Sequence, residues 1–433
     1  MPRFVIDLAP LRRSRDLRLL IGGQLVSVLG TQMTGVAVSY QVYRLTRSSL
    51  DVGLVSLAML APLVAGALAG GAAADALDRR RLMLAVTALM AACIAGLAVN
   101  AGAATSLWPL YVLPALAAGL SGFFDAALSA VIPNLVGRGD VATANAMFQA
   151  VFQLSLVAGP SAAGLLLAGT GIQFVYWIDV ASYAAAIVSV LLMSPQPPAR
   201  APDLDSDGAV RAARPARARV PSLRSLAEGF RFTRGRQAIQ GAYLIDLNAT
   251  FFGLPRALFP ALAATRFGGG ASAVGFLYAA PGAGALLGAL TTGWVGRVRR
   301  QGRAVIIAVL IWGAAIAAFG LVTWLAAALA LLAVAGWADV ISAVFRNAII
   351  QLSVPDAMRG RLMGLQIAVV TGGPRLGDVE SGAVAAAFGD TVSAVSGGLA
   401  CVAGTLVLAR LLPGFRRQRA AQAEQADGPG GTD

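Results

Sequence analysis

Nine ionisable side chains lie inside stretches of this chain that are otherwise strongly apolar. An unpaired charge in hydrocarbon costs about 2.5–3.5 kcal/mol on insertion scales, so embedded charges serve ion pairs, proton transfer or binding of charged ligands. The sequence contains no His, so any proton relay must use Asp or Glu. The nine residues are Asp125, Asp179, Asp246, Arg256, Asp339, Arg346, Arg375, Asp378 and Glu380.

Helical spacing brings some of these charges onto a common face. Asp339 and Arg346 are seven residues apart, which is two helical turns. Asp246 and Arg256 are ten apart, close to three turns, so they are expected to share a face roughly. Pro255 interrupts helical regularity beside Arg256. A cation at such a break suits an anionic or phenolic ligand.

The segment GGPRLGDVESG (372–382) combines three charges with helix-weakening residues. Arg375 and Asp378 are three apart and can pair on one face, whereas Glu380 lies about 200° around a regular helix from Asp378. Irregular backbone at membrane depth survives only inside protein or along a water-filled cavity. We therefore expect Arg375 to contact substrate or clamp Asp378, and Asp378 or Glu380 to take up a proton. The alternative is a static ion pair that braces this span.

Two acids occupy matching positions in separate parts of the chain. GFFDAALSAVIPNLV (122–136) aligns with GWADVISAVFRNAII (336–350), and the shared G-x-x-D places Asp125 and Asp339 at corresponding depths. Either acid could instead be a hydrogen-bonded group in helix packing. Asp179 lies near the end of its span, where placement at the membrane surface is the alternative to function.

The composition predicts a polytopic α-helical membrane protein. Hydrophobic residues make up 57% of the chain and charged residues 13%, against about 25% charged residues in soluble domains. Apolar stretches of about 20 residues recur, each long enough to cross the bilayer as a helix. The predicted fold class is therefore all-α, with twelve transmembrane helices in two pseudo-symmetric six-helix halves. The predicted spans are near 18–43, 51–74, 82–101, 106–134, 144–168, 172–193, 238–262, 272–296, 303–322, 324–350, 360–387 and 391–412.

A polar connection separates the first six spans from the last six. It is rich in Pro, Ala and Arg, as linkers are, although 223–234 could form a helix along the membrane surface. We expect an N-terminal half over 1–193, a linker over 194–237, a C-terminal half over 238–412 and a disordered tail over 413–433. If the spans alternate, 28 Arg residues lie on the side of the termini and 3 on the other. The positive-inside rule then makes both termini cytoplasmic in a multi-pass protein of the cell (inner) membrane.

The segment GAAADALDRRR (71–81) follows the second span and resembles the loop motif of the major facilitator superfamily. Gly71, Asp75, Arg79, Arg80 and Arg81 match the pattern G-x-x-x-D-R/K-x-G-R/K-R/K, and Ala76 and Asp78 depart from it. The resemblance implies a gating role, in which Asp75 and a neighbouring Arg hold one conformation. The three Arg residues could instead be topology signals alone.

The segment AGPSAAG (158–164) resembles the antiporter motif of drug and proton exchangers in the same superfamily. Gly159 and Pro160 are expected to kink the span, and Gly164 to admit another helix at close range. The second Gly of the family pattern is replaced by Leu165. The resemblance favours outward transport, and a pure packing motif is the alternative.

A wider resemblance is to the branch that contains the enterobactin (siderophore) exporter and related bacterial efflux proteins. It is carried by LFPALAATRFGG (258–269), VGFLYAAPGAGALLGALTTG (274–293) and VPDAMRGRLMGL (354–365). It implies a secondary transporter, working as a monomer in the lipid bilayer, that exports a small amphipathic siderophore or drug by alternating access as a proton antiporter. An importer or lipid flippase of the same fold is the alternative.

The sequence argues against catalysis and cofactors. It has no His, no P-loop and no metal-binding spacing, so we expect no enzyme, no catalytic residues, no metal and no cofactor, with the proton gradient as energy source. The basic residues are spread over loops between apolar spans, a pattern of membrane topology and not of nucleic-acid binding. A membrane enzyme or a non-transporting receptor is therefore disfavoured.

Overall fold

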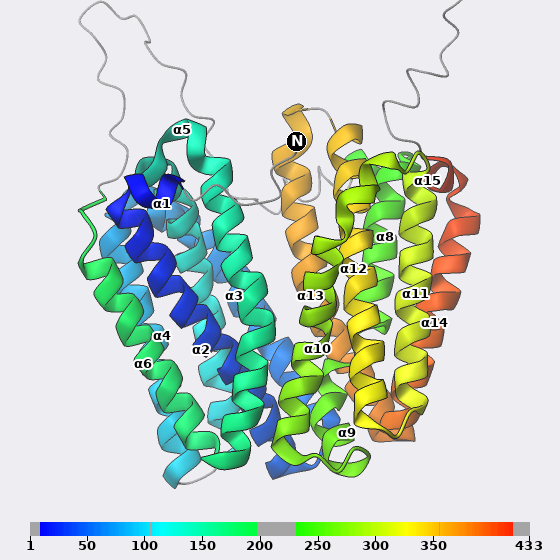
Figure 1. Ribbon diagram of the computed structural model, residues 1–433, viewed down its shortest axis with the longest axis horizontal. Coiled ribbons are helices and arrows are strands. Elements are labelled where there is room, and N and C mark those ends of the chain that lie inside the picture. The colour runs from blue at the N-terminus through cyan, green and yellow to red at the C-terminus, as the bar shows by residue number, and fades with distance from the viewer. Residues whose placement is uncertain (1–8, 104–105, 197–230, 355, 419–433) are drawn as a thin grey trace, which may run out of the picture. The chain divides into compact units, whose positions relative to one another are not determined.

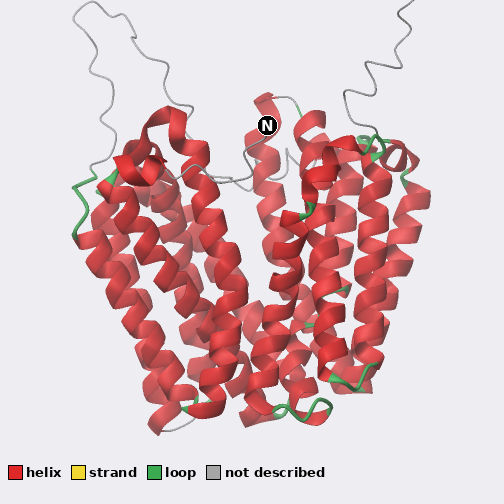
Figure 2. Cartoon of the chain, in the orientation of Figure 1, coloured by secondary structure: helices red, strands yellow, loops and turns green. Residues whose placement is uncertain are grey.

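The computed structural model describes residues 9–103, 106–196, 231–354 and 356–418, and Figure 2 shows helices throughout these ranges with no strand among them. The two 3-10 segments are η1 (Arg256–Leu258) and η2 (Thr292–Arg297). The α-helices are α1 (Ala9–Arg13), α2 (Arg15–Thr46), α3 (Ser49–Ala76), α4 (Arg79–Ala103), α5 (Trp108–Gly169), α6 (Ile172–Leu191), α8 (Gln237–Phe252), α9 (Phe259–Thr265), α10 (Gly270–Leu290), α11 (Gln301–Leu321), α12 (Leu325–Ser353), α13 (Asp356–Phe388), α14 (Asp390–Leu411) and α15 (Pro413–Arg417).

The described helices form twelve long segments, which confirms the predicted all-α class. The loop expected over 134–143 is absent, because α5 continues through it and leaves helical geometry only at Gly137 (φ 72°, ψ 168°). Glycine adopts this positive φ without the clash that a Cβ would cause. The break divides α5 into two spans, Trp108–Gly137 and Gly139–Gly169.

Ten of these twelve segments are long and apolar enough to cross a membrane. The two further segments have identifiable reasons for departing from that pattern. The seventh is broken into α8, η1 and α9, and none of these pieces reaches spanning length alone. The eleventh, α13, carries Arg375, Asp378 and Glu380 within its apolar stretch. The polar connection predicted at 194–237, including the possible surface helix at 223–234, lies largely outside the described residues.

The chain forms two compact units by its internal contacts. Of the described residues, unit 1 takes those within Met1–Ala37, Ala58–Ser155 and Thr170–Ser222, and unit 2 takes those within Val38–Leu57, Leu156–Gly169 and Leu223–Asp433. The second unit thus takes in the end of α2, the start of α3 and the end of α5. These boundaries follow three-dimensional contacts and differ from the predicted division of the sequence into halves.

Within unit 1, α4 packs along α6. Within unit 2, α12 packs against α10 and α11, α14 packs against α11, and α8 contacts α13 and α14 (Figure 1). The sequence around 413 departs from the disordered tail predicted there, because Pro413–Arg417 is helical and Phe415 is fully buried. The ring of Phe415 lies against Gly241 and its backbone lies against Gly302, and a side chain at either glycine would collide with Phe415.

Candidate functional site

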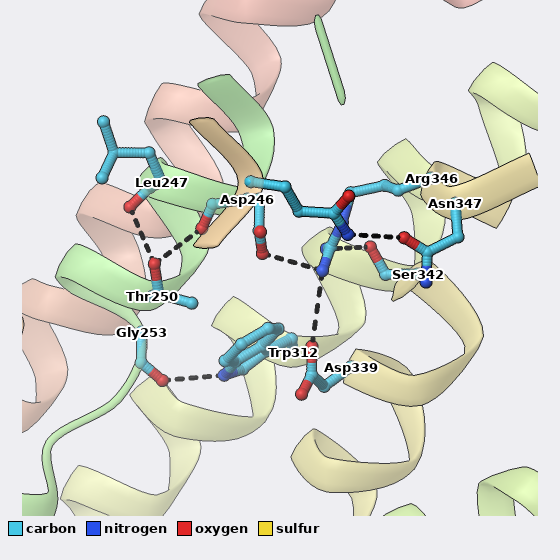
Figure 3. Close-up of polar contacts among 10 residues, drawn as sticks. Asp246, Leu247, Thr250, Gly253, Trp312, Asp339, Ser342, Arg346 and Asn347 are labelled. Carbon is cyan, nitrogen blue, oxygen red and sulfur yellow. Dashed lines mark hydrogen bonds and ion pairs between the residues drawn. The ribbon is translucent and has the colours of Figure 1, made fainter. Parts of the chain in front are cut away.

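A buried ion pair joins α8 to α12 in unit 2. Nη2 of Arg346 lies 2.7 Å from Oδ1 of Asp246, and each side chain is 9% exposed (Figure 3). Nη1 of Arg346 donates a hydrogen bond of 2.7 Å to the hydroxyl of Ser342 one turn earlier. This short, charge-assisted contact satisfies a cation and an anion that would each be costly to bury alone.

A second carboxylate shares the same guanidinium. Oδ1 of Asp339 lies 3.9 Å from Nη2 of Arg346, and the Asp339 side chain is 44% exposed. The prediction that Asp339 and Arg346 share a helical face is confirmed, since both lie on α12 and converge in Figure 3. Two acids therefore surround one cation, which leaves this cluster one negative charge in excess when both acids are ionised.

The predicted irregularity beside Arg256 is present. Helix α8 ends at Phe252, and the chain resumes as η1 at Arg256. The carbonyl of Gly253 accepts a 2.7 Å hydrogen bond from Nε1 of Trp312, which satisfies backbone that the break releases (Figure 3). Because of the break, the expectation that Asp246 and Arg256 share the face of one helix is wrong. The Arg256 side chain is exposed, whereas Asp246 is buried.

Helix α13 runs unbroken through the segment 372–382, so the suspected local irregularity is absent. Nη1 of Arg375 donates a 2.8 Å hydrogen bond to the carbonyl of Thr371, one turn earlier on the same helix. Among the described residues, Arg375 and Asp378 form no ion pair within 4 Å. Their expected clamp is therefore not made in this structure.

Asp378 is a buried acid with an unused acceptor. Its residue is 7% exposed, and its Oδ1 has no hydrogen-bond partner within the described part of the chain. Ser56 and the backbone of Ala257 are its neighbouring donors, and Arg256 and Arg375 are its neighbouring cations. Burial disfavours the ionised form of this carboxyl group, whereas the neighbouring donors and cations favour it.

The two other predicted acids are less enclosed. Glu380 is half-buried on α13, and Asp125 is exposed on the first part of α5. Neither makes a hydrogen bond or ion pair with another described residue. The structure thus brings Asp246, Asp339 and Arg346 together, and no ion pair joins Glu380 to them among the described residues of unit 2.

The arginines of the loop motif bind helix ends within unit 1. Nη1 of Arg79 donates 3.1 Å to the carbonyl of Ala130 on α5, and Arg79 is 8% exposed. The Arg80 guanidinium donates to the carbonyls of Val190 and Leu191 at the end of α6. The Val190 carbonyl also accepts a 3.2 Å hydrogen bond from the backbone N–H of Met193, so Arg80 adds a charged donor to the cap of α6.

In the loop motif, Asp78 makes the structural contact, whereas Asp75, which was expected to pair with an Arg, does not. Asp78 departs from the family pattern. Its Oδ1 accepts a 2.9 Å hydrogen bond from the backbone N–H of Arg81 and so caps the start of α4. Asp75 is exposed and makes no ion pair with a described residue. Gly71 is half-buried on α3, and the Arg81 side chain is exposed.

The glycine motif on α5 permits close helix contact, as expected. A Cβ on Gly164 would lie 2.8 Å from Cα of Gly275 and 2.9 Å from the carbonyl oxygen of Ser272, both on α10. The backbones of α5 and α10 therefore approach each other at this pair of glycines. Gly159 and Pro160 are buried one turn earlier, within a stretch of helical backbone.

Asp179 is the embedded acid whose environment the sequence did not indicate. It was a candidate for the membrane surface, yet it is fully buried in unit 1. Its carboxyl group contacts the hydroxyls of Thr34 on α2 and Ser182 on α6. Ser182 at i+3 was the one local signal that this acid has a polar partner.

Comparison with known proteins agrees with this helical architecture. Residues 6–427 match the family described as transmembrane secretion effectors, within the major facilitator superfamily. Enterobactin exporters of Shigella boydii serotype 18 and Escherichia coli O139:H28 are each 29% identical over 422 residues, covering 96% of this chain and of theirs.

Solved transporter structures share the fold at low sequence identity. The nucleoside transporter NupG aligns with a TM-score of 0.71 at 14% identity, covering 93% of this chain and 100% of that one. A POT family transporter in complex with 5-aminolevulinic acid aligns with a TM-score of 0.70 at 12% identity, covering 93% and 97%. The chain is a multi-pass membrane transporter that belongs to the transmembrane secretion effector family of the major facilitator superfamily.

Proposed function

We propose that this transporter exports a small amphipathic compound, of siderophore or drug-like type, in exchange for protons. The observation that carries the proposal is the buried cluster in which Arg346 bridges Asp246 at 2.7 Å and Asp339 at 3.9 Å. Excess acid around one embedded cation is an arrangement that binds a proton. The relatives named as enterobactin exporters support the outward direction and the substrate class.

Within the cluster, Asp339 is the carboxyl that exchanges the proton. Asp246 makes the short bond and is enclosed, so its charge is balanced by Arg346 in both protonation states. Asp339 makes the longer contact and is partly exposed, so a proton can reach and leave it. When Asp339 is ionised it competes with Asp246 for Arg346, and when protonated it releases that cation. The proton therefore changes the forces between α8 and α12 within unit 2.

Asp378 is proposed as a further proton acceptor on α13, with Glu380 as its alternative. Oδ1 of Asp378 is buried without a hydrogen-bond partner among the described residues, and Gly53 on α3 lies directly against the main chain of Asp378. A change of charge at Asp378 would act on this α3–α13 contact within unit 2. Asp125 on α5 is proposed as the counterpart of Asp339 along the proton route.

Arg256 and Arg375 are proposed to attract the substrate. Arg256 projects an exposed guanidinium from the break between α8 and α9. Arg375 is half-buried and engages only part of its donors with Thr371. Two guanidinium groups near Asp378 suit a ligand with anionic or phenolic oxygens, to which Arg can donate two parallel hydrogen bonds.

The remaining parts of the proposal concern setting and energy. The strong excess of Arg on the side of the termini supports cytoplasmic termini in the cell membrane. The proton gradient is the proposed energy source, and the monomer is the proposed working unit. Arg79, Arg80 and Arg81 with Gly71 and Asp75 form the proposed gating segment, and Gly159, Pro160 and Gly164 the proposed antiporter segment.

The proposal is tested by growing the native host in low iron with and without the gene. Siderophore should accumulate inside the deletion strain and be depleted in its medium, and the intact gene should restore secretion. A deletion strain that carries the D339N gene in place of the wild-type gene should not recover siderophore secretion. Equal secretion by all strains would contradict the siderophore assignment, and a panel of efflux substrates would then be compared in the same strains.

Direction and energy source need a purified system. Proteoliposomes of known orientation, loaded with the compound identified in cells, should release it when a proton gradient is imposed and without ATP. Uptake that follows the gradient inward would favour the importer alternative. Transfer of labelled lipid between leaflets would favour the flippase.

A further inference from the structure

A second polar cluster lies in unit 1, between α2 and α6, and takes no part in the proposed transport chemistry. At its centre is Asp179, whose residue is fully buried. Oδ2 of Asp179 accepts a 2.6 Å hydrogen bond from the hydroxyl of Thr34 on α2, and Oδ1 lies 2.9 Å from the hydroxyl oxygen of Ser182. A side chain on Gly30 would collide with Oδ1 and with Ser182, so the glycine lets the carboxyl group reach the α2 backbone.

The number of hydrogens available in this cluster bears on the protonation of Asp179. The Ser182 hydroxyl has a single hydrogen, and its shorter contact is 2.7 Å to the backbone carbonyl of Asp179. If that bond takes the hydrogen, the 2.9 Å contact between Ser182 and Oδ1 needs a hydrogen from the carboxyl group. The Thr34 bond is compatible with either a neutral or an ionised acceptor, so the argument for a protonated carboxyl group comes from the single hydrogen at Ser182.

The surroundings of Asp179 supply no compensating cation. Among the described residues, the titratable group that faces it is Tyr183 on α6, which carries no positive charge. The Tyr183 hydroxyl bonds to Thr31 at 3.0 Å, which anchors a neighbouring turn of α2. No Arg of the described chain makes an ion pair with Asp179. An ionised carboxylate here would be a buried, unpaired charge, whereas a carboxylic acid has every polar atom satisfied.

We infer that Asp179 holds a proton as a neutral carboxylic acid and acts as a hydrogen-bonded clamp between α2 and α6. As a clamp it donates to Ser182 and accepts from Thr34, and it stays protonated through the transport cycle. It is therefore an embedded acid that does not carry the transported proton. The clamp holds α2 just before Ala37, where the helix passes from unit 1 to unit 2. This inference stands apart from the proposed function, since it concerns the protonation of a group outside that site.

Infrared spectroscopy of the purified transporter tests the inference directly. At neutral pH, the spectrum of the wild type minus that of D179N should contain the carbonyl stretch of one protonated carboxylic acid. The S182A variant should keep this band but move it toward the position of a carboxyl group without an acceptor. Absence of any protonated-acid band from the difference, or its replacement by a carboxylate band, would overturn the inference.

Stability and transport give an independent readout. The amide of D179N can donate to Ser182 and accept from Thr34, so this variant should keep the wild-type melting temperature and wild-type secretion. The D179A and T34V variants each remove a partner and should lower the apparent melting temperature by several degrees. Well-folded D179N protein that has lost proton-driven secretion would show that Asp179 carries a functional charge, and the clamp would be rejected.

Discussion

Asp246 on α8 and Arg346 on α12 form an ion pair of 2.7 Å between residues that are 100 positions apart in the chain, with both side chains 9% exposed. Each partner makes the other tolerable in this position, because either charge alone would be buried without compensation. Asp339 adds a second, weaker contact to the same guanidinium. This unequal sharing suggests experiments that separate stability from proton coupling.

Removal of Arg346 is expected to destabilise the transporter more than removal of the whole pair. The variant R346Q leaves Asp246 ionised in a dry environment, a change that typically costs about 3–5 kcal/mol. The double variant D246N/R346Q removes both charges and should recover part of the loss. Apparent melting temperatures of the purified proteins in one detergent would measure the difference. As a control, D140N disrupts only the exposed 3.7 Å contact with Arg13 and should change stability by less than about 1 kcal/mol. Equal losses in the single and double variants would argue against coupling.

Neutralising Asp339 is expected to abolish proton-driven export while leaving the fold intact. The D339N side chain keeps its shape and leaves the short Asp246–Arg346 bond in place, so the melting temperature should change little. Transport driven by an imposed proton gradient should disappear, whereas substrate exchange at equal concentrations should continue. Gradient-driven transport at the wild-type rate would remove Asp339 from the coupling mechanism.

Asp378 is expected to be a coupling residue as well. D378N supplies an amide where a proton would otherwise bind and fixes the site in its neutral form. Gradient-driven export should be lost in D378N, and E380Q separates the contribution of the neighbouring, half-buried acid. Wild-type export in both variants would reject a proton role for this part of α13.

The glycine contact between α5 and α10 is expected to be sterically essential. In G164A the new methyl group would meet Cα of Gly275 at 2.8 Å, and overpacking of this kind typically costs about 1–3 kcal/mol. The matched control is G22A on α2, where no atom beyond the local backbone of its own helix lies within 4 Å of the added methyl group. That control should be neutral or slightly stabilising, by about 0.5–1 kcal/mol. Identical melting temperatures for both variants would contradict the close packing.

Arg80 is expected to contribute stability through the end of α6. R80A removes the guanidinium donor from the carbonyls of Val190 and Leu191, and a hydrogen bond to a charged group contributes about 1.5–3 kcal/mol. Arg80 is half-buried, so the lower part of that range applies. R81A changes an exposed neighbour and is the control. If both variants melt at the wild-type temperature, the cap has no measurable effect.

The sequence by itself determined the membrane class, the number of long helices and the family. These depend on composition, on apolar stretches of spanning length and on motifs, all of which are local properties of the chain. It also indicated the break beside Arg256, because Pro255 removes a backbone donor wherever it stands. The shared helical face of Asp339 and Arg346 could also be predicted from the sequence, because helical periodicity determines it.

Only the tertiary structure decided which charges meet across helices. The partner of Arg346 is Asp246, and nothing in the spacing of two distant segments predicts a contact between α8 and α12. Arg375 turns back to its own helix at Thr371, although spacing allowed a pair with Asp378. Asp179 is enclosed because Gly30 and Thr34 of α2 pack against it. Helical periodicity specifies the face of a residue, whereas burial and partner depend on the neighbouring helix that covers that face.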